Sequence, residues 1–193
     1  MTIELQGFQT TIANAVQLTG IGVHSGNPVS MTFQPADVGT GIVFHRLHDN
    51  GNVTELKAVS ANVGNTDLCT VLGRSLPQSV ATIEHVMAAI YAMGIDNLIV
   101  AVDGPEVPIM DGSSASFIEA IEQVGIKTQS AKRRYIRVIK PVRIDNGTSW
   151  AEFRPYDGTR YEVEIDFDTP LIGRQLWAGD LTAETFKNEL SRA

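Results

Sequence analysis

An internal repeat limits the folds open to this chain more than any other feature of its sequence. Residues 33–40 (FQPADVGT) recur, one residue shorter, as residues 153–159 (FRPYDGT). In both copies a turn containing glycine and a strand pattern precede the repeat, and another strand pattern follows it. Self-similarity of this kind indicates a duplicated supersecondary unit. We therefore expect two similar α+β domains, residues 1–127 and 128–193, each with strands in one layer and helices in the other.

The two copies differ in length. When they are aligned through Phe33 and Phe153, the second copy has its strands and a helical pattern over residues 181–193, but it stops before a counterpart of the main helix of the first copy. The second domain is therefore expected to be incomplete and the chain to be a fragment. Without covering helices, part of one strand should face water, namely Val163, Ile165 and Phe167.

A strongly apolar helix is predicted between Thr82 and Gly94. Apolar residues recur at helical spacing, and Gly94 offers a C-terminal cap. The stripe consists of Ile83, Val86, Met87, Ile90 and Met93. Glu84 and His85 lie side by side at the start of this segment, which otherwise has no charge from residue 80 to residue 93.

The Glu84–His85 pair has two interpretations. In the first, Glu84 favours the positive end of the helix dipole and His85 is a satisfied core residue. In the second, His85 ligates a metal ion and Glu84 takes a proton from a metal-bound water, as in hydrolytic sites. A dipeptide does not decide between them.

Two other residues, Cys69 and Asp111, also have two interpretations each. Cys69 lies in an expected short strand over residues 65–72, where it is a small buried hydrophobe or a reactive thiol. Asp111 precedes an expected helix over residues 114–124, where it serves as a cap or turn residue or orients a catalytic histidine. The other patterns predict strands at residues 10–12, 16–23, 29–33, 42–44, 98–102 and 161–167.

Composition excludes several classes of protein. The 193 residues carry a formal net charge of −7, which argues against a general electrostatic grip on nucleic acid. The basic run at residues 132–134 is expected to be a solvated linker. No apolar run is long enough for a transmembrane segment, and no secretion signal is recognised, so the cytoplasm is the expected compartment.

Cysteine and histidine usage restricts the possible metal sites. Cys69 is the only cysteine, so no internal disulfide forms and any metal must rest on His, Asp and Glu. His45 and His48 do not form an obvious pair of ligands, because residues three apart on a strand point to opposite faces. We expect them to be polar residues of a loop.

Six stretches resemble the signatures of one family, the zinc-dependent UDP-3-O-acyl-N-acetylglucosamine deacetylases of lipid A biosynthesis. The resemblance runs from near the start of the chain to Ala193. The family fold, two similar α+β domains around a zinc site, agrees with the repeat. The stretches are residues 19–26 (TGIGVHSG), 68–70 (LCT), 82–85 (TIEH), 94–97 (GIDN), 108–113 (PIMDGS) and 150–153 (WAEF).

The resemblance implies specific roles. His85 would be one of three Zn²⁺ ligands, Glu84 the general base, and Asp111 the partner of a catalytic histidine. Leu68 and Cys69 would lie near the passage for the acyl chain of the substrate, UDP-3-O-acyl-N-acetylglucosamine. The full-length enzyme would be a monomer.

The chain also departs from the family pattern. The other two zinc ligands come from a His-Lys-x-x-x-Asp stretch, which this sequence does not contain. The catalytic histidine, which follows later in the family, is also missing. These 193 residues alone are therefore expected to be inactive. The alternative is a non-catalytic paralogue that binds a nucleotide sugar or a partner protein.

Overall fold

The computed structural model describes residues 7–75 and 77–192 and has the expected α+β architecture. The largest sheet has five strands in the order β2–β3–β6–β4–β5. All neighbours in it are antiparallel except β4 and β6. Its strands are β2 (Val16–Ile21), β3 (Pro28–Pro35), β4 (Ile42–Leu47), β5 (Val53–Lys57) and β6 (Leu98–Val102).

Strand β3 shows why this sheet has one covered face. Val29, Met31 and Phe33 are buried, whereas the residues between them are more exposed. Because successive side chains of a strand point to opposite faces, this alternation directs one face of the sheet into the core. The strands predicted at residues 16–23 and 29–33 are thus confirmed as β2 and β3, which pair in antiparallel fashion with Val16 opposite Phe33.

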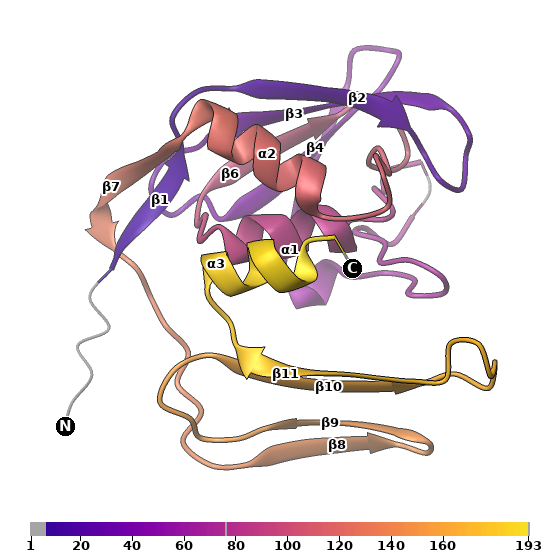
Figure 1. Ribbon diagram of the computed structural model, residues 1–193. Coiled ribbons are helices and arrows are strands. Elements are labelled where there is room, and N and C mark those ends of the chain that lie inside the picture. The colour runs from indigo at the N-terminus through magenta and orange to yellow at the C-terminus, as the bar shows by residue number, and fades with distance from the viewer. Residues whose placement is uncertain (1–6, 76, 193) are drawn as a thin grey trace.

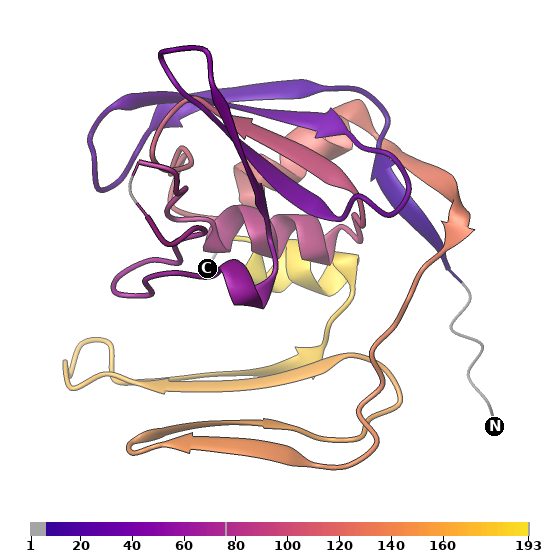
Figure 2. The ribbon, with the colours of Figure 1, turned by 180° about the vertical axis from the view of Figure 1, so that it is seen from behind.

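Two helices cover that face (Figures 1 and 2). Helix α1 (Glu84–Ala92) buries Val86, Ala89 and Ile90, and the chain turns at Gly94, whose φ of 70° favours glycine. Helix α2 (Ala115–Val124) buries Phe117, Ile118 and Ile121 and is followed by Gly125. Both helices occur where the apolar spacing predicted them, within one or two residues.

A second, smaller sheet joins distant parts of the chain. Strand β1 (Phe8–Ile12) pairs with β7 (Ile126–Lys132), in antiparallel fashion. Strand β7 therefore extends on both sides of the boundary expected between residues 127 and 128. The division into two domains at that point remains a prediction.

The second half of the chain forms two separate ribbons. Strand β8 (Val142–Asn146) pairs with β9 (Ser149–Phe153), and β10 (Arg160–Asp166) pairs with β11 (Arg174–Asp180). In both views the ribbons lie on the far side of α1 from the main sheet (Figures 1 and 2). As expected, apolar side chains are exposed here: Val163 and Ile165 of β10 by 45% and 48%, and Phe167, which follows the strand, by 44%.

The hairpins of the two repeat copies have matching features. Val142 pairs opposite Phe153 in the second, as Val16 pairs opposite Phe33 in the first. The turns contain Gly26 and Gly147, with φ of 67° and 64°. These correspondences are those expected of a duplication, which remains an inference from the sequence.

The last helical segment returns to the first half of the chain (Figure 1). Phe186 packs against the core, and Lys187 Nζ pairs with Glu122 Oε1 of α2 at 2.7 Å. At the start of α2 the Ser114 amide donates to the Ser191 carbonyl at 2.9 Å. The segment comprises α3 (Ala183–Thr185) and a π-helical stretch, η2 (Phe186–Leu190); a short 3-10 helix, η1 (Ser60–Asn62), lies earlier in the chain.

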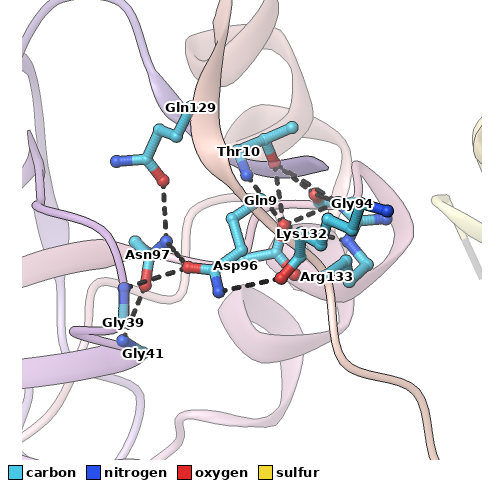
Figure 3. A network of polar contacts seen from close by, with 10 residues as sticks. All are labelled: Gln9, Thr10, Gly39, Gly41, Gly94, Asp96, Asn97, Gln129, Lys132 and Arg133. Atoms are coloured by element: carbon cyan, nitrogen blue, oxygen red, sulfur yellow. Dashed lines mark hydrogen bonds and ion pairs between the residues drawn. The ribbon is translucent and has the colours of Figure 1, made fainter. Parts of the chain in front are cut away.

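A polar network just after the C-terminal end of α1 binds the segment that leads to the ribbons (Figure 3). Arg133 donates to Asp96 Oδ2 from both Nε, at 3.0 Å, and Nη2, at 2.7 Å. The same carboxylate oxygen accepts the Thr10 amide at 2.8 Å. The prediction of a solvated linker at residues 132–134 is therefore wrong for Arg133, because tertiary folding brings Asp96 to it.

Replacement of Arg133 by alanine should destabilise the fold. It removes a partly buried, charge-assisted pair of hydrogen bonds, so we expect urea unfolding to show a loss of about 2 kcal/mol. Arg174→Ala is the matched control. It breaks the pair with Glu164 on an exposed ribbon and should change the unfolding free energy little. Equal losses in the two variants would contradict the role assigned to Arg133.

Candidate active site

Glu84 is the first residue of α1 and is held by one of its two carboxylate oxygens. Its Oε2 accepts the Thr70 amide at 2.9 Å. Within the part of the chain that the structure describes, Oε1 has no hydrogen-bond partner. Glu84 is half-buried and lies in the first turn of the helix. It is thus fixed in direction and still has one oxygen to offer.

His85, the next residue, is half-buried beside Glu84. Its backbone carbonyl accepts the Ser114 hydroxyl at 3.0 Å, so the beginnings of α1 and α2 are joined at this point. Ser114 in turn lies three residues after Asp111. The described contacts therefore connect the loop of Asp111 to the start of α1.

Cys69 and Leu68 lie in a loop that crosses the start of α1. The expected strand over residues 65–72 is wrong, since the segment has bends and only isolated bridges, from Leu72 to Val63 and to Val80. Two hydrogen bonds join the loop to the start of α1: the Thr70 amide donates to the Glu84 carboxylate, and the Ile83 amide donates to the Thr70 carbonyl. Cys69 is half-buried and Leu68 is 93% exposed.

Asp111 is exposed and is a turn residue rather than the cap of α2. Its Oδ1 accepts the Ser113 hydroxyl at 2.8 Å and the Ser113 amide at 3.1 Å, and the N-cap position is Ser114. These hydrogen bonds, first that from the Ser113 hydroxyl, lower the pKa of the Asp111 carboxyl. It is therefore ionised near neutral pH.

Backbone strain gathers at these loops. Among the described residues, Leu68, Thr82 and Met110 are the three non-glycine residues with positive φ, at 65°, 61° and 57°. Each lies one or two residues before a predicted site residue: Cys69, Glu84 or Asp111. Such conformations cost on the order of 1–3 kcal/mol each and persist only where the surroundings enforce them. Sequence patterns carry no signal for them.

A buried carboxylate beside the site was missed by the sequence reasoning. Glu106 is only 3% exposed, and it accepts the Ser25 amide at 2.7 Å, the His24 amide at 3.2 Å and the Thr82 hydroxyl at 3.2 Å. Burial raises the pKa of Glu106, but the hydrogen bonds from Ser25, His24 and Thr82 outweigh it and the net shift is downward. A signal existed, because this glutamate stands between prolines in an otherwise apolar loop.

Gly22 leaves the space that Glu106 occupies. A Cβ at residue 22 would lie 2.2 Å from Glu106 Oε1, so a side chain there would displace the carboxylate. This close approach explains why residue 22, in the stretch TGIGVHSG, is a glycine.

The match to known proteins agrees with these features. The model of the family LpxC, UDP-3-O-acyl N-acetylglycosamine deacetylase, matches residues 9–193. The chain belongs to this deacetylase family. It is also 56% identical over 189 residues to the UDP-3-O-acyl-N-acetylglucosamine deacetylases of Brucella ovis and Brucella canis, and 55% identical to that of Brucella melitensis.

The chain is shorter than these family members. The aligned residues are 98% of this chain and 65% of the length of each of the three relatives. The family assignment thus rests on almost all of this chain, whereas about a third of each relative has no counterpart in it.

The described residues do not form a metal site by themselves. The described residues contain no group of three or more His, Cys, Asp and Glu side chains that could hold a metal ion. His45 lies on β4 near Glu55, at 3.9 Å, and His48 contacts Thr54, so neither joins His85. The prediction that both are loop residues is wrong for His45, which belongs to strand β4, whereas His48 follows the strand.

Within residues 7–75 and 77–192, no helix combines the length and the apolar character that crossing a bilayer requires.

The contribution of the Glu106 carboxylate to stability should be visible in the pH dependence of the unfolding free energy. Its pKa is lower in the folded than in the unfolded chain, so its contribution is fully present above the unfolded-state pKa. That contribution is lost as the pH falls through the lower, folded-state pKa. We expect the difference in unfolding free energy between the wild type and Glu106→Gln to be largest near neutral pH and to shrink in acid.

Urea unfolding at several pH values provides the measurement. Glu119→Gln, which changes an exposed carboxylate on α2, is the control and should show a small difference throughout. A difference between the wild type and Glu106→Gln that did not vary with pH would contradict the ionised state assigned to Glu106.

Proposed function

We propose that the protein containing these residues removes acetate from UDP-3-O-acyl-N-acetylglucosamine in lipid A biosynthesis. Membership of the deacetylase family supports this reaction, as does the identity of 56% to relatives that bear its name. We further propose that the protein works as a monomer in the cytoplasm. The net charge of −7 supports a small-molecule substrate over nucleic acid.

The observation that carries the proposal is the arrangement of Glu84. One oxygen is held by the Thr70 amide, and the other has no described partner, beside the half-buried His85. This is the arrangement that a general base needs, because the carboxylate is oriented and still has a lone pair for a proton. Glu84 would accept the proton of the water that attacks the acetamide carbonyl.

His85 is proposed as a ligand of Zn²⁺. A catalytic zinc ion normally has three protein ligands and an open position, and the described residues do not make up such a set. They therefore do not fit a complete zinc site by themselves. His85 would supply one of these ligands.

Two loops would complete the surroundings of Glu84. Asp111, ionised and exposed, would orient the imidazole of a catalytic histidine supplied by a further part of the polypeptide. Leu68, which is 93% exposed, and Cys69 would form part of the apolar passage for the acyl chain. The link from the Asp111 loop to α1 through Ser114 supports a common site.

A second function follows from the incomplete ligand set. A non-catalytic paralogue would retain the fold and bind a nucleotide sugar or a partner protein without turnover.

Glu84→Ala tests the proposed reaction. The assay is acetate release from UDP-3-O-acyl-N-acetylglucosamine by a polypeptide that extends over the full length of the relatives. Turnover should fall by about 10²-fold or more, as expected on loss of a general base, while the zinc content stays unchanged. Glu119→Ala, on the exposed side of α2, should keep wild-type turnover. A wild-type protein without turnover would support the non-catalytic paralogue, and full activity of Glu84→Ala would exclude Glu84 as the base.

Asp111→Asn separates orientation of a histidine from turn formation. Asparagine keeps an oxygen for the Ser113 hydrogen bonds but lacks the charge, so the melting temperature should change little. Turnover should fall by about 10- to 100-fold, as when a carboxylate that orients a histidine at a metal site is lost. Asp37→Asn, an exposed change distant in sequence, is the control. Unchanged turnover of Asp111→Asn would show that Asp111 only stabilises the turn.

A further inference from the structure

We infer that Glu106 is a positioning residue that holds Thr82 in its left-handed conformation and thereby directs Glu84 toward Thr70. This inference rests on the proposed role of Glu84 as the base. It assigns Glu106 no contact with substrate. The residue would act through the backbone just before α1.

Thr82 is in a conformation that its side chain disfavours. Its φ is 61°, it is β-branched, and it is 2% exposed. A β-branched residue with positive φ is an outlier, and a strained residue keeps such a conformation only where its surroundings over-determine it. The described polar partner of its side chain is Glu106, whose Oε2 accepts the Thr82 hydroxyl at 3.2 Å.

The backbones of the two segments are also held together. The Ala81 amide donates to the Pro105 carbonyl at 2.9 Å, and the Val107 amide donates to the Ala81 carbonyl at 3.2 Å. These bonds form a parallel bridge between Ala81 and Glu106. These bonds place Glu106 beside Ala81, the residue that precedes Thr82. The Glu106 carboxylate is therefore close enough to accept the Thr82 hydroxyl.

The start of α1 shows the consequence. A threonine near a helix start commonly uses its hydroxyl oxygen to accept a free backbone N–H. Here the N-cap residue is Ile83, no side chain caps the helix, and the Thr82 hydroxyl is engaged by Glu106. Thr82 is the last residue before the helical conformation begins. The φ angle of Thr82 therefore sets the direction in which the backbone continues into Ile83 and Glu84.

Glu106 also binds the turn between β2 and β3, and holding this turn is a competing explanation for its role. Its carboxylate accepts the amides of His24 and Ser25. If Glu106 served only that turn, its loss would disturb residues 22–27 and leave α1 unaffected. A test must therefore observe the turn and the start of α1 separately.

Amide NMR of the 193-residue chain gives the two readouts. A residue with positive φ has a short distance between its own amide and α protons, so Thr82 should show a strong intraresidue NOE. The Thr70 amide should be shifted downfield by its bond to the Glu84 carboxylate. The Glu84→Ala variant provides the reference shift for a Thr70 amide without that bond.

Substitutions at Thr82 test the conformation directly. Thr82→Val keeps the shape but has no hydroxyl, so the strong NOE should be lost and the Thr70 amide should move to the reference position. Thr82→Gly also has no hydroxyl, but glycine adopts positive φ freely, so the Thr70 amide should stay near its wild-type position. Identical Thr70 shifts in the two variants would overturn the inference.

Rescue of Glu106→Ala is the decisive comparison. This variant should move the amides of Thr70, His24 and Ser25. Addition of Thr82→Gly should restore Thr70 and leave His24 and Ser25 displaced. A Thr70 amide unaffected by Glu106→Ala, or one not restored in the double variant, would overturn the inference. If Glu106→Ala does not fold, the comparison of Thr82→Val with Thr82→Gly still tests the inference.

Asp96→Asn is the matched control, because it weakens the polar network at the other end of α1. It should lower stability and leave the signals of Thr70 and Thr82 unchanged. A shift of Thr70 in this control equal to that in Thr82→Val would count against a specific role of Glu106. No readout uses acetate release, so failure of this inference and failure of the proposed deacetylation are separate results.

Discussion

The start of α1 depends on hydrogen bonds that come from other parts of the chain. No side chain caps this helix. Thr70 contacts Glu84 from one loop, Ser114 contacts the His85 carbonyl from α2, and Glu106 contacts Thr82 from a third segment. Because each contact comes from a different segment, the direction of Glu84 is a property of the assembled first half. It would be lost in an isolated helix.

The core beneath makes this arrangement possible. Val86, Ala89 and Ile90 of α1 belong to one buried cluster with residues of the five-stranded sheet. A close-packed interior resists small displacements, so it can maintain strained backbone beside it. Thr82, whose φ is positive, is itself buried and lies two residues before the start of α1.

The second half of the chain is built differently. Its ribbons expose apolar side chains such as Ile165 and Trp150. The described contacts with the first half include the pair of Arg133 with Asp96 and the pair of Lys187 in η2 with Glu122 in α2. Phe186 of η2 also packs against the core of the first half.

The sequence by itself determined the local elements and the family. Alternation in β3, helical spacing in α1 and α2 and the glycines after both helices are local signals, and they predicted these elements because burial of one face follows from periodicity. The motif residues Glu84, His85 and Asp111 were recognisable in the same way. Only the tertiary structure decided that residues 65–72 form a loop, that Arg133 is paired, and that Glu106 is a buried carboxylate beside Thr82. Their partners lie 14 to 82 residues away in the chain, and local patterns carry no information on contacts made only when distant segments fold together.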